Sequence, residues 1–95
     1  MNNFEPMRWG VIGLGIGEQH ATTIEEDSSM QLTALCDLSS DTLESVGSRF
    51  PAASRFTDEL ELIRSGTVDA VVIASYDNQH AEAVVAALDS DIHVF

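Results

Sequence analysis

Short apolar runs that alternate with helix-like segments are the feature that most limits how this sequence can fold. The runs are rich in β-branched residues, and the segments between them repeat apolar residues at helical spacing. Strands that alternate with helices form parallel βαβ units with right-handed crossovers. The sequence therefore predicts an α/β fold, a doubly wound parallel (Rossmann) sheet of strand order 3-2-1-4-5. Its expected strands are 8–13, 31–37, 53–56, 69–74 and 92–95.

Helix signals fill the segments between these runs. The first helix is expected at about 18–27. The Ser-Ser-Asp stretch 39–41 offers N-caps for the second helix, which should end before Pro51. Thr57 is expected to cap the third helix, and Gly66 to end it. The fourth helix is expected at about 79–89, with an inner face formed by Ala81, Val84, Ala87 and Leu88.

Length and composition limit the chain to one domain. Its 95 residues suggest an N-terminal arm at 1–7 and a single folding unit at 8–95. Apolar runs fall short of the roughly 20 residues that cross a membrane. Residues 1–7 lack the basic and then apolar pattern of a secretion signal. We therefore expect a cytoplasmic protein.

The charge balance is strongly acidic. Asp and Glu number 16 against 4 Lys and Arg, for a net charge of −12. Such a charge argues against nucleic acid and anionic membranes as partners. One hypothesis is a salt-loving source, because at about 1 M salt the Debye length falls to about 3 Å and surface repulsion is screened. An acidic mesophilic protein is the alternative, and a melting curve against KCl concentration separates the two.

A glycine-rich turn follows the first expected strand. Gly13 permits a tight turn, and Gly15 lets the backbone approach a pyrophosphate. The free amides at the start of the next helix, including those of Ile16 and Gly17, would attract the phosphates together with the helix dipole. The G-x-G-x-x-G fingerprint would place its third glycine one position later, where Glu18 stands. An ordinary strand-to-helix turn is the alternative.

Asp37 ends the second expected strand, near the position about 20 residues past the glycines where dinucleotide-binding folds carry an acid. A carboxylate there accepts hydrogen bonds from the ribose hydroxyls of adenosine and repels a 2′-phosphate. The next three positions, 38–40, contain no arginine to bind such a phosphate. The sequence therefore predicts NAD rather than NADP as the cofactor. A plain aspartate that caps the next turn is the alternative.

Cys36 is the single cysteine of the chain. One cysteine forms neither an internal disulfide nor a zinc site, so we expect no metal. Because it lies within an apolar run, we expect a small buried hydrophobe rather than a reactive thiol.

Three segments, taken together, resemble the N-terminal NAD(P)-binding domain of the Gfo/Idh/MocA oxidoreductases. They are WGVIGLGIGEQH at 9–20, DAVVIASYDNQH at 69–80 and ALDSDIHVF at 87–95. The family commonly reads D-A-V-x-I-A-T-P-N-x-x-H in the second segment and A-L-x-x-G-x-H-V in the third. The resemblance covers the chain from Arg8 onward. It implies a Rossmann domain of an oxidoreductase that transfers hydride between a nicotinamide cofactor and a sugar or polyol.

The resemblance also implies a second part of the cofactor site, after the fourth strand. Ser75 keeps the hydroxyl of the family threonine, and Tyr76 replaces the proline with a ring that can pack on the cofactor. Asp77 stands at the usual asparagine, so Asn78 is expected to take over that contact. His80 matches the family histidine beside the cofactor. A solvent-facing histidine in the first helical turn is the alternative.

The family carries a substrate-site motif that this sequence lacks. In the family, H-V is soon succeeded by E-K-P, whose lysine acts at the substrate, whereas this sequence ends at Phe95 and contains no lysine. We therefore expect a fragment without the second, substrate-binding domain and without catalytic residues. It should bind NAD without turning over a sugar or polyol. The interrupted fifth strand would offer a free edge, so self-association through 92–95 is expected.

Two other functions stay open at this stage. One is a non-catalytic Rossmann module that senses a nucleotide or acts as a scaffold. The other is a domain that binds a different nucleotide, such as S-adenosylmethionine, with the same glycine turn. NAD titration and the coding sequence beyond residue 95 address the first, and the resemblance at 74–80 speaks against the second.

Overall fold

Strands and helices alternate throughout the computed structural model, which describes residues 5–74 and 80–95. Within those residues the strands form a five-stranded sheet of order β3-β2-β1-β4-β5, parallel in every pairing. This confirms the predicted doubly wound α/β fold and its strand order. The elements are β1 (Met7–Ile12), α1 (Leu14–Glu26), β2 (Met30–Cys36), α2 (Ser40–Gly47), β3 (Ser54–Phe56), α3 (Glu59–Arg64), β4 (Ala70–Ile73), α4 (Ala81–Asp89) and β5 (His93–Val94).

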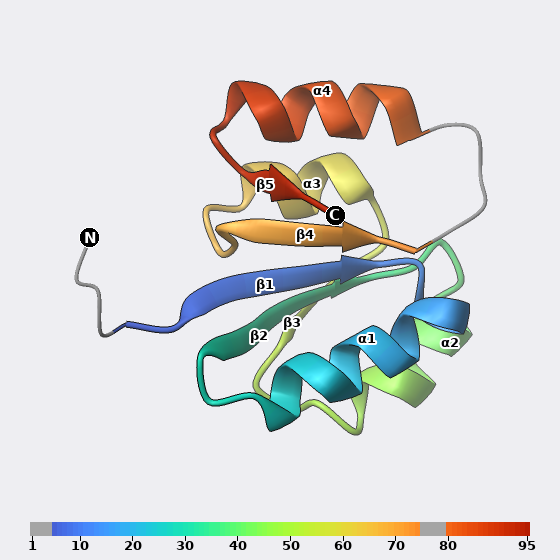
Figure 1. Ribbon diagram of the computed structural model, residues 1–95. Coiled ribbons are helices and arrows are strands. Elements are labelled where there is room, and N and C mark those ends of the chain that lie inside the picture. The colour runs from blue at the N-terminus through green and yellow to red at the C-terminus, as the bar shows by residue number, and fades with distance from the viewer. Residues whose placement is uncertain (1–4, 75–79) are drawn as a thin grey trace.

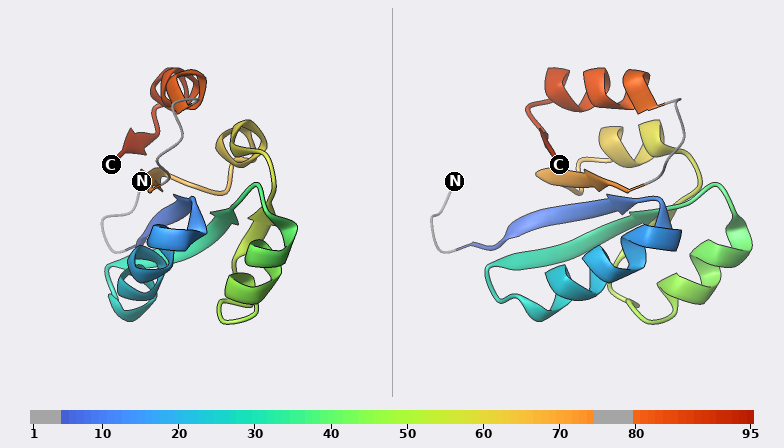
Figure 2. Two further views of the ribbon diagram at one scale, coloured as in Figure 1. Left: turned by 90° about the vertical axis from the view of Figure 1, so that its right-hand side faces the viewer. Right: turned by 45° about the vertical axis from the view of Figure 1, so that its right-hand side comes forward.

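Helices cover both faces of the sheet (Figures 1 and 2). The pair α1 and α2 lies on one face, and the pair α3 and α4 lies on the other. Each face has its own apolar core. Val11, Leu14 and Leu35 are central to the first core, and Leu62, Ile63 and Val71 to the second. Within the described ranges, no helix is long and apolar enough to cross a membrane.

A β-bulge at Thr33 decides which side chains of β2 enter each core. The pairing of β1 with β2 steps from Trp9↔Leu32 to Gly10↔Ala34, so Thr33 has no partner in the register. As a result Leu32 packs in the core under α1 and α2, whereas Ala34 packs in the core under α3 and α4. The Thr33 hydroxyl lies 2.6 Å from the carbonyl oxygen of Thr67 and 3.2 Å from that of Trp9.

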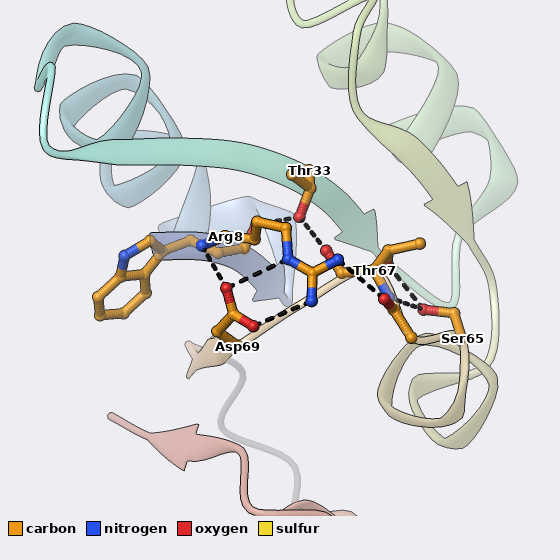
Figure 3. A network of polar contacts seen from close by, with 7 residues as sticks. Arg8, Thr33, Ser65, Thr67 and Asp69 are labelled. Carbon is orange, nitrogen blue, oxygen red and sulfur yellow. Dashed lines mark hydrogen bonds and ion pairs between the residues drawn. The ribbon is translucent and has the colours of Figure 1, made fainter. Parts of the chain in front are cut away.

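Polar side chains tie the amino ends of the strands together (Figure 3). The Arg8 guanidinium donates to both carboxylate oxygens of Asp69, over 3.2 and 2.9 Å, and to the carbonyl oxygen of Gly66 over 2.9 Å. The backbone amide of Arg8 also donates to Asp69, over 2.9 Å. These bonds hold the pKa of the Asp69 carboxyl below its usual range. They join β1 to the connection between α3 and β4.

The first helix begins four residues earlier than the sequence suggested. Helix α1 starts at Leu14, directly after Gly13, whose φ of 89° lies in a region that side chains rarely adopt. The Gly17 amide then donates to the Gly13 carbonyl over 3.0 Å. The glycine turn is therefore mostly the first turn of the helix.

Two further details of the helices differ from expectation. Asp58, rather than Thr57, caps α3, because its carboxylate reaches the Leu60 amide at 2.9 Å. In α4 the buried residues are Ala83 and Ala87, whereas Leu88 is 60% exposed. Every position from 83 to 88 is apolar, so spacing does not select a face and packing decides it. Ser39 caps α2, as the Ser-Ser-Asp stretch suggested.

Candidate dinucleotide-binding site

A cleft of about 590 Å³ opens at the carboxyl ends of β1 and β2, between the starts of α3 and α4. Ligands of doubly wound sheets bind at this end of the strands. The cleft therefore lies where a dinucleotide would be expected. Its lining includes Gly13, Asp37, Leu38, Glu59, His80 and Glu82.

The start of α1 presents free backbone donors beside this cleft. The first amides of a helix have no partner within the helix. Here the Leu14 amide donates to Asp37 over 2.8 Å. Within the described residues, the amides of Gly15 and Ile16 make no hydrogen bond. Two N–H groups at the positive end of a 13-residue helix are thus available to an anion.

The three glycines of the turn serve different purposes. Gly13 supplies the positive φ. A Cβ at Gly15 would meet no atom within 4 Å, so the space beside it is open. A Cβ at Gly17 would lie 2.7 Å from Val11 Cγ1 and 3.4 Å from the Ala74 Cβ. Gly17 therefore lets the helix pack against the sheet, which is the usual purpose of the third glycine despite its early position. Contact of Gly17 with a cofactor stays a prediction.

Asp37 joins the end of β2 to the start of α1. Its Oδ2 accepts from the Leu14 amide at 2.8 Å, and its Oδ1 accepts from the Ser39 amide at 2.9 Å. The carboxylate thus caps its own turn, as the alternative interpretation required. A carboxylate has about four lone-pair sites, so about two stay available to ribose hydroxyls. The capping and the ribose-binding roles are compatible.

The charge of the cleft lining is negative. Asp37, Asp58, Glu59 and Glu82 line it, and its described lining contains no arginine. Arg8 pairs with Asp69 at the opposite end of the sheet, and Arg49, just after α2, pairs with Glu18 of α1. The walls would therefore repel an additional phosphate, and attraction for a diphosphate would have to come from the free amides at the start of α1.

His80 pairs with a carboxylate on the neighbouring helix. It precedes α4, and its Nδ1 lies 2.8 Å from Oε2 of Glu59 at the start of α3. The two side chains are 17% and 22% exposed. The other imidazole nitrogen, Nε2, is buried and has no partner among the described residues. The alternative of a solvent-facing histidine does not hold, and contact of His80 with a cofactor stays a prediction. Ser75, Tyr76 and Asn78 lie outside the described residues.

Cys36 lies in the wall of the cleft and is 2% exposed, which confirms the buried hydrophobe predicted from sequence. Burial raises the pKa of its thiol to about 12, and the charges of Glu59, Asp37, Asp58 and Glu61 act in the same direction. The thiol is therefore protonated at neutral pH.

Of the lining residues, only Gly13, Asp37 and His80 were predicted as site residues, and Leu38 and Glu59 are two of those that were not. Leu38 is 80% exposed at its edge, and its position directly after the strand-end acid was the available signal. Glu59 lies at the start of α3 and lines the cleft as well. Its pairing with His80 spans 21 residues of sequence, which no local pattern reveals.

Comparisons with known proteins show the family of the chain. A family model described as "Oxidoreductase family, NAD-binding Rossmann fold" (Gfo/Idh/MocA) matches residues 7–95. Myo-inositol 2-dehydrogenase of Thermotoga maritima is 38% identical over 90 residues, which cover 94% of this chain and 27% of that protein. Inositol 2-dehydrogenase/D-chiro-inositol 3-dehydrogenase of Shouchella clausii is 36% identical over 92 residues, again 94% and 27% of the two chains.

Solved structures give the same result. Scyllo-inositol dehydrogenase from Lactobacillus casei, with bound NAD(H) and scyllo-inositol, superposes with a TM-score of 0.86 at 27% identity. The match covers 96% of this chain and 27% of that one. This chain thus spans about a quarter of the length of the proteins it matches. It belongs to the Gfo/Idh/MocA oxidoreductase family and has the family's NAD-binding Rossmann fold.

Proposed function

We propose that this chain is the cofactor-binding domain of an NAD-dependent dehydrogenase that acts on inositol or a similar polyol. The hydrogen bond between Asp37 and the Leu14 amide carries the proposal. It holds the carboxylate that ends β2 against the first turn of α1. A ribose acceptor and an anion-binding helix start thereby lie side by side, which is the arrangement that one half of a dinucleotide needs. The names of the relatives supply the substrate class.

Each part of the cofactor has a proposed partner in the chain. The amides of Gly15 and Ile16 would bind the diphosphate, and Asp37 would bind the adenosine ribose. His80, with Ser75, Tyr76 and Asn78 before it, would lie along the nicotinamide half. Bound NAD supplies the hydride chemistry, while these residues bind and orient it.

NAD is the proposed cofactor rather than NADP because of the charges around Asp37. A 2′-phosphate on the adenosine ribose would face the Asp37 carboxylate in a cleft that Asp58, Glu59 and Glu82 also line. The described lining holds no arginine that could compensate. Like charges at such short range in a partly enclosed site are costly.

Turnover is proposed to require more chain than these residues. We assign no catalytic residue here, and the matched relatives are longer, since this chain spans 27% of each. A polyol dehydrogenase that draws on the NAD pool would work in the cytoplasm. A net charge of −12 disfavours nucleic acid and anionic membranes.

In the described residues β5 pairs only with β4, so its outer edge is proposed to join a second copy. A strictly monomeric mass by light scattering would contradict that contact.

Calorimetric titration of the chain with NAD and NADP tests the proposal. We expect wild type to bind NAD at least about tenfold more tightly than NADP. Asp37→Asn keeps one side-chain acceptor but loses the charge. It should weaken NAD binding by about tenfold, the value of a hydrogen bond to a charged group, and reduce the preference for NAD.

Asp41→Asn is the matched control. Asp41 is an exposed residue in the first turn of α2, outside the cleft lining, and its substitution removes the same charge. Its NAD affinity should equal that of wild type. Equal affinities for all three proteins, or no binding of NAD to wild type, would refute the proposed function.

A further inference from the structure

We propose that Glu59 is a positioning residue that fixes the orientation and tautomer of His80 for the bound cofactor. The inference rests on the proposed function. It concerns Glu59, which belongs neither to the glycine turn nor to the end of β2 where Asp37 lies. The contact between Glu59 Oε2 and His80 Nδ1, at 2.8 Å, is its starting point.

The chemistry of the two groups fixes the position of a proton. An ionised carboxylate only accepts hydrogen bonds, so His80 Nδ1 must carry the hydrogen in this contact. In the neutral imidazole, Nε2 then has a free lone pair. The partner of one ring nitrogen thus determines what the other nitrogen can do. Glu59 makes Nε2 the acceptor.

The packing of α3 against α4 places Glu59 and His80 next to each other. Asp58 caps α3 and so fixes the helical turn that begins at Glu59. Helices α3 and α4 pack through one apolar core, in which Leu62 and Ala83 are each 0% exposed. The contact between Glu59 and His80 therefore joins the starts of two helices that pack against each other.

The second observation is the lack of a partner for Nε2. This atom is buried, and no described residue bonds to it. Buried polar atoms without partners are uncommon because they lose their hydration without compensation. Both His80 and Glu59 line the cleft. A hydroxyl of the nicotinamide ribose, which donates hydrogen bonds, has the chemistry that an Nε2 acceptor requires.

Two kinds of substitution separate positioning from a general structural effect. Glu59→Met keeps the length of the side chain and removes the acceptor, and Glu59→Ala provides the same loss if the first variant does not fold. Glu59→Gln keeps an acceptor and should rescue. Glu61→Met is the matched control, because Glu61 is exposed on the same helix and lies outside the cleft lining.

Nitrogen-15 NMR of the histidine rings gives a readout that needs no cofactor. At alkaline pH, where imidazoles are neutral, wild type, Glu59→Gln and Glu61→Met should show the Nδ1–H tautomer at His80. Glu59→Met should show a mixture or the opposite tautomer. An unchanged tautomer in Glu59→Met and Glu59→Ala would overturn the inference.

Calorimetric titration with NAD is the second arm. We expect about tenfold weaker binding to Glu59→Met, and wild-type affinity for Glu59→Gln and Glu61→Met. A changed tautomer with unchanged NAD affinity would also overturn the inference. A wild-type chain that binds no NAD would instead refute the proposed function, while the NMR arm would still decide whether Glu59 sets the tautomer.

Discussion

The polar groups at the two ends of the sheet differ in how far they are hydrogen-bonded. At the amino end the Arg8 guanidinium, the Asp69 carboxylate and the Gly66 carbonyl bind one another (Figure 3). At the carboxyl end the amides of Gly15 and Ile16 have no partner among the described residues. The fold contributes to this difference, because helix starts with free amides follow the carboxyl ends of parallel strands. The residues contribute the rest, because Arg8 and Asp69 pair at the amino end.

This difference separates stability from binding. Polar groups that hydrogen-bond to one another stabilise the fold, whereas unpaired donors beside an open cleft are free to bind a ligand. Substitutions at the amino end should therefore change the free energy of unfolding without changing NAD affinity. Substitutions at the open part of the carboxyl end should do the reverse.

Gly17→Ala should have the largest effect, a loss of thermal stability. It tests whether Gly17, next to the free amides of Gly15 and Ile16, is already a packing position. The added Cβ would lie 2.7 Å from a methyl group of Val11, which is fully buried. Overpacking of this kind costs about 1–3 kcal/mol, and the helix propensity of alanine offsets up to about 1 kcal/mol of it, so we expect a net loss of about 1–2 kcal/mol. We expect the melting temperature to fall by about 5–15 °C. A melting temperature equal to that of wild type would show that Gly17 is not a packing position.

Gly15→Ala, two residues earlier, should weaken NAD binding without lowering stability. Its Cβ would meet no protein atom within 4 Å, so thermal unfolding should be unchanged or shifted slightly upward. The same methyl group would occupy the space that the diphosphate needs. Calorimetry should show NAD binding weakened by about tenfold or more. Wild-type affinity for NAD in this variant would place the diphosphate elsewhere.

Asp69→Asn probes the amino end and should have a smaller effect. Its loss of hydrogen bonds to a half-exposed arginine should lower the free energy of unfolding by about 1 kcal/mol at pH 7. Arg8 lowers the pKa of Asp69 in the folded state, so the stabilisation is present above the unfolded pKa of about 3.9. It is lost as the pH falls through the lower folded pKa.

Urea unfolding across that pH range checks the prediction. The difference between wild type and Asp69→Asn should shrink as the pH drops below about 4. NAD affinity at pH 7 should be that of wild type. A stability difference that does not vary with pH would remove the Arg8–Asp69 pair from this account.

The last prediction needs no substitution and concerns the rate at which the Cys36 thiol is alkylated. Its thiol is 2% exposed, and burial raises its pKa to about 12. Alkylation by iodoacetamide at pH 8 should be slow in the native protein and fast in urea. Native labelling as fast as that of free cysteine would mean that the cleft wall opens readily.

Much of the fold was predictable because its signals are local. Apolar runs bounded by turn residues gave the strands, and right-handed crossovers gave their order. The start of α1 was not predictable in the same way, because glycines lower helix propensity and here they form the first turn. The bulge at Thr33 could not be predicted because β2 is apolar on both faces. A one-residue shift in which side chains face each core therefore does not change the sequence pattern.

The candidate site was predictable only in part, for a related reason. Asp37 could be placed beside the glycine turn from sequence spacing. Its hydrogen bond to the Leu14 amide depends on how β2 and α1 meet in space. The pairing of Glu59 with His80 depends on the packing of α3 against α4, and neither residue predicts the other.

Titration of the ¹⁵N-labelled chain with NAD, followed through its backbone amide signals, shows whether the start of α1 binds the diphosphate. The amide signals of Gly15 and Ile16 should shift most as NAD saturates the protein, and the Ser39 amide should shift less, because it is bonded to Asp37. The amides of Thr33 and Asp69, at the other end of the sheet, should stay in place. Stationary Gly15 and Ile16 signals at saturation, or the largest shifts at the amino end, would contradict binding of the diphosphate at the start of α1.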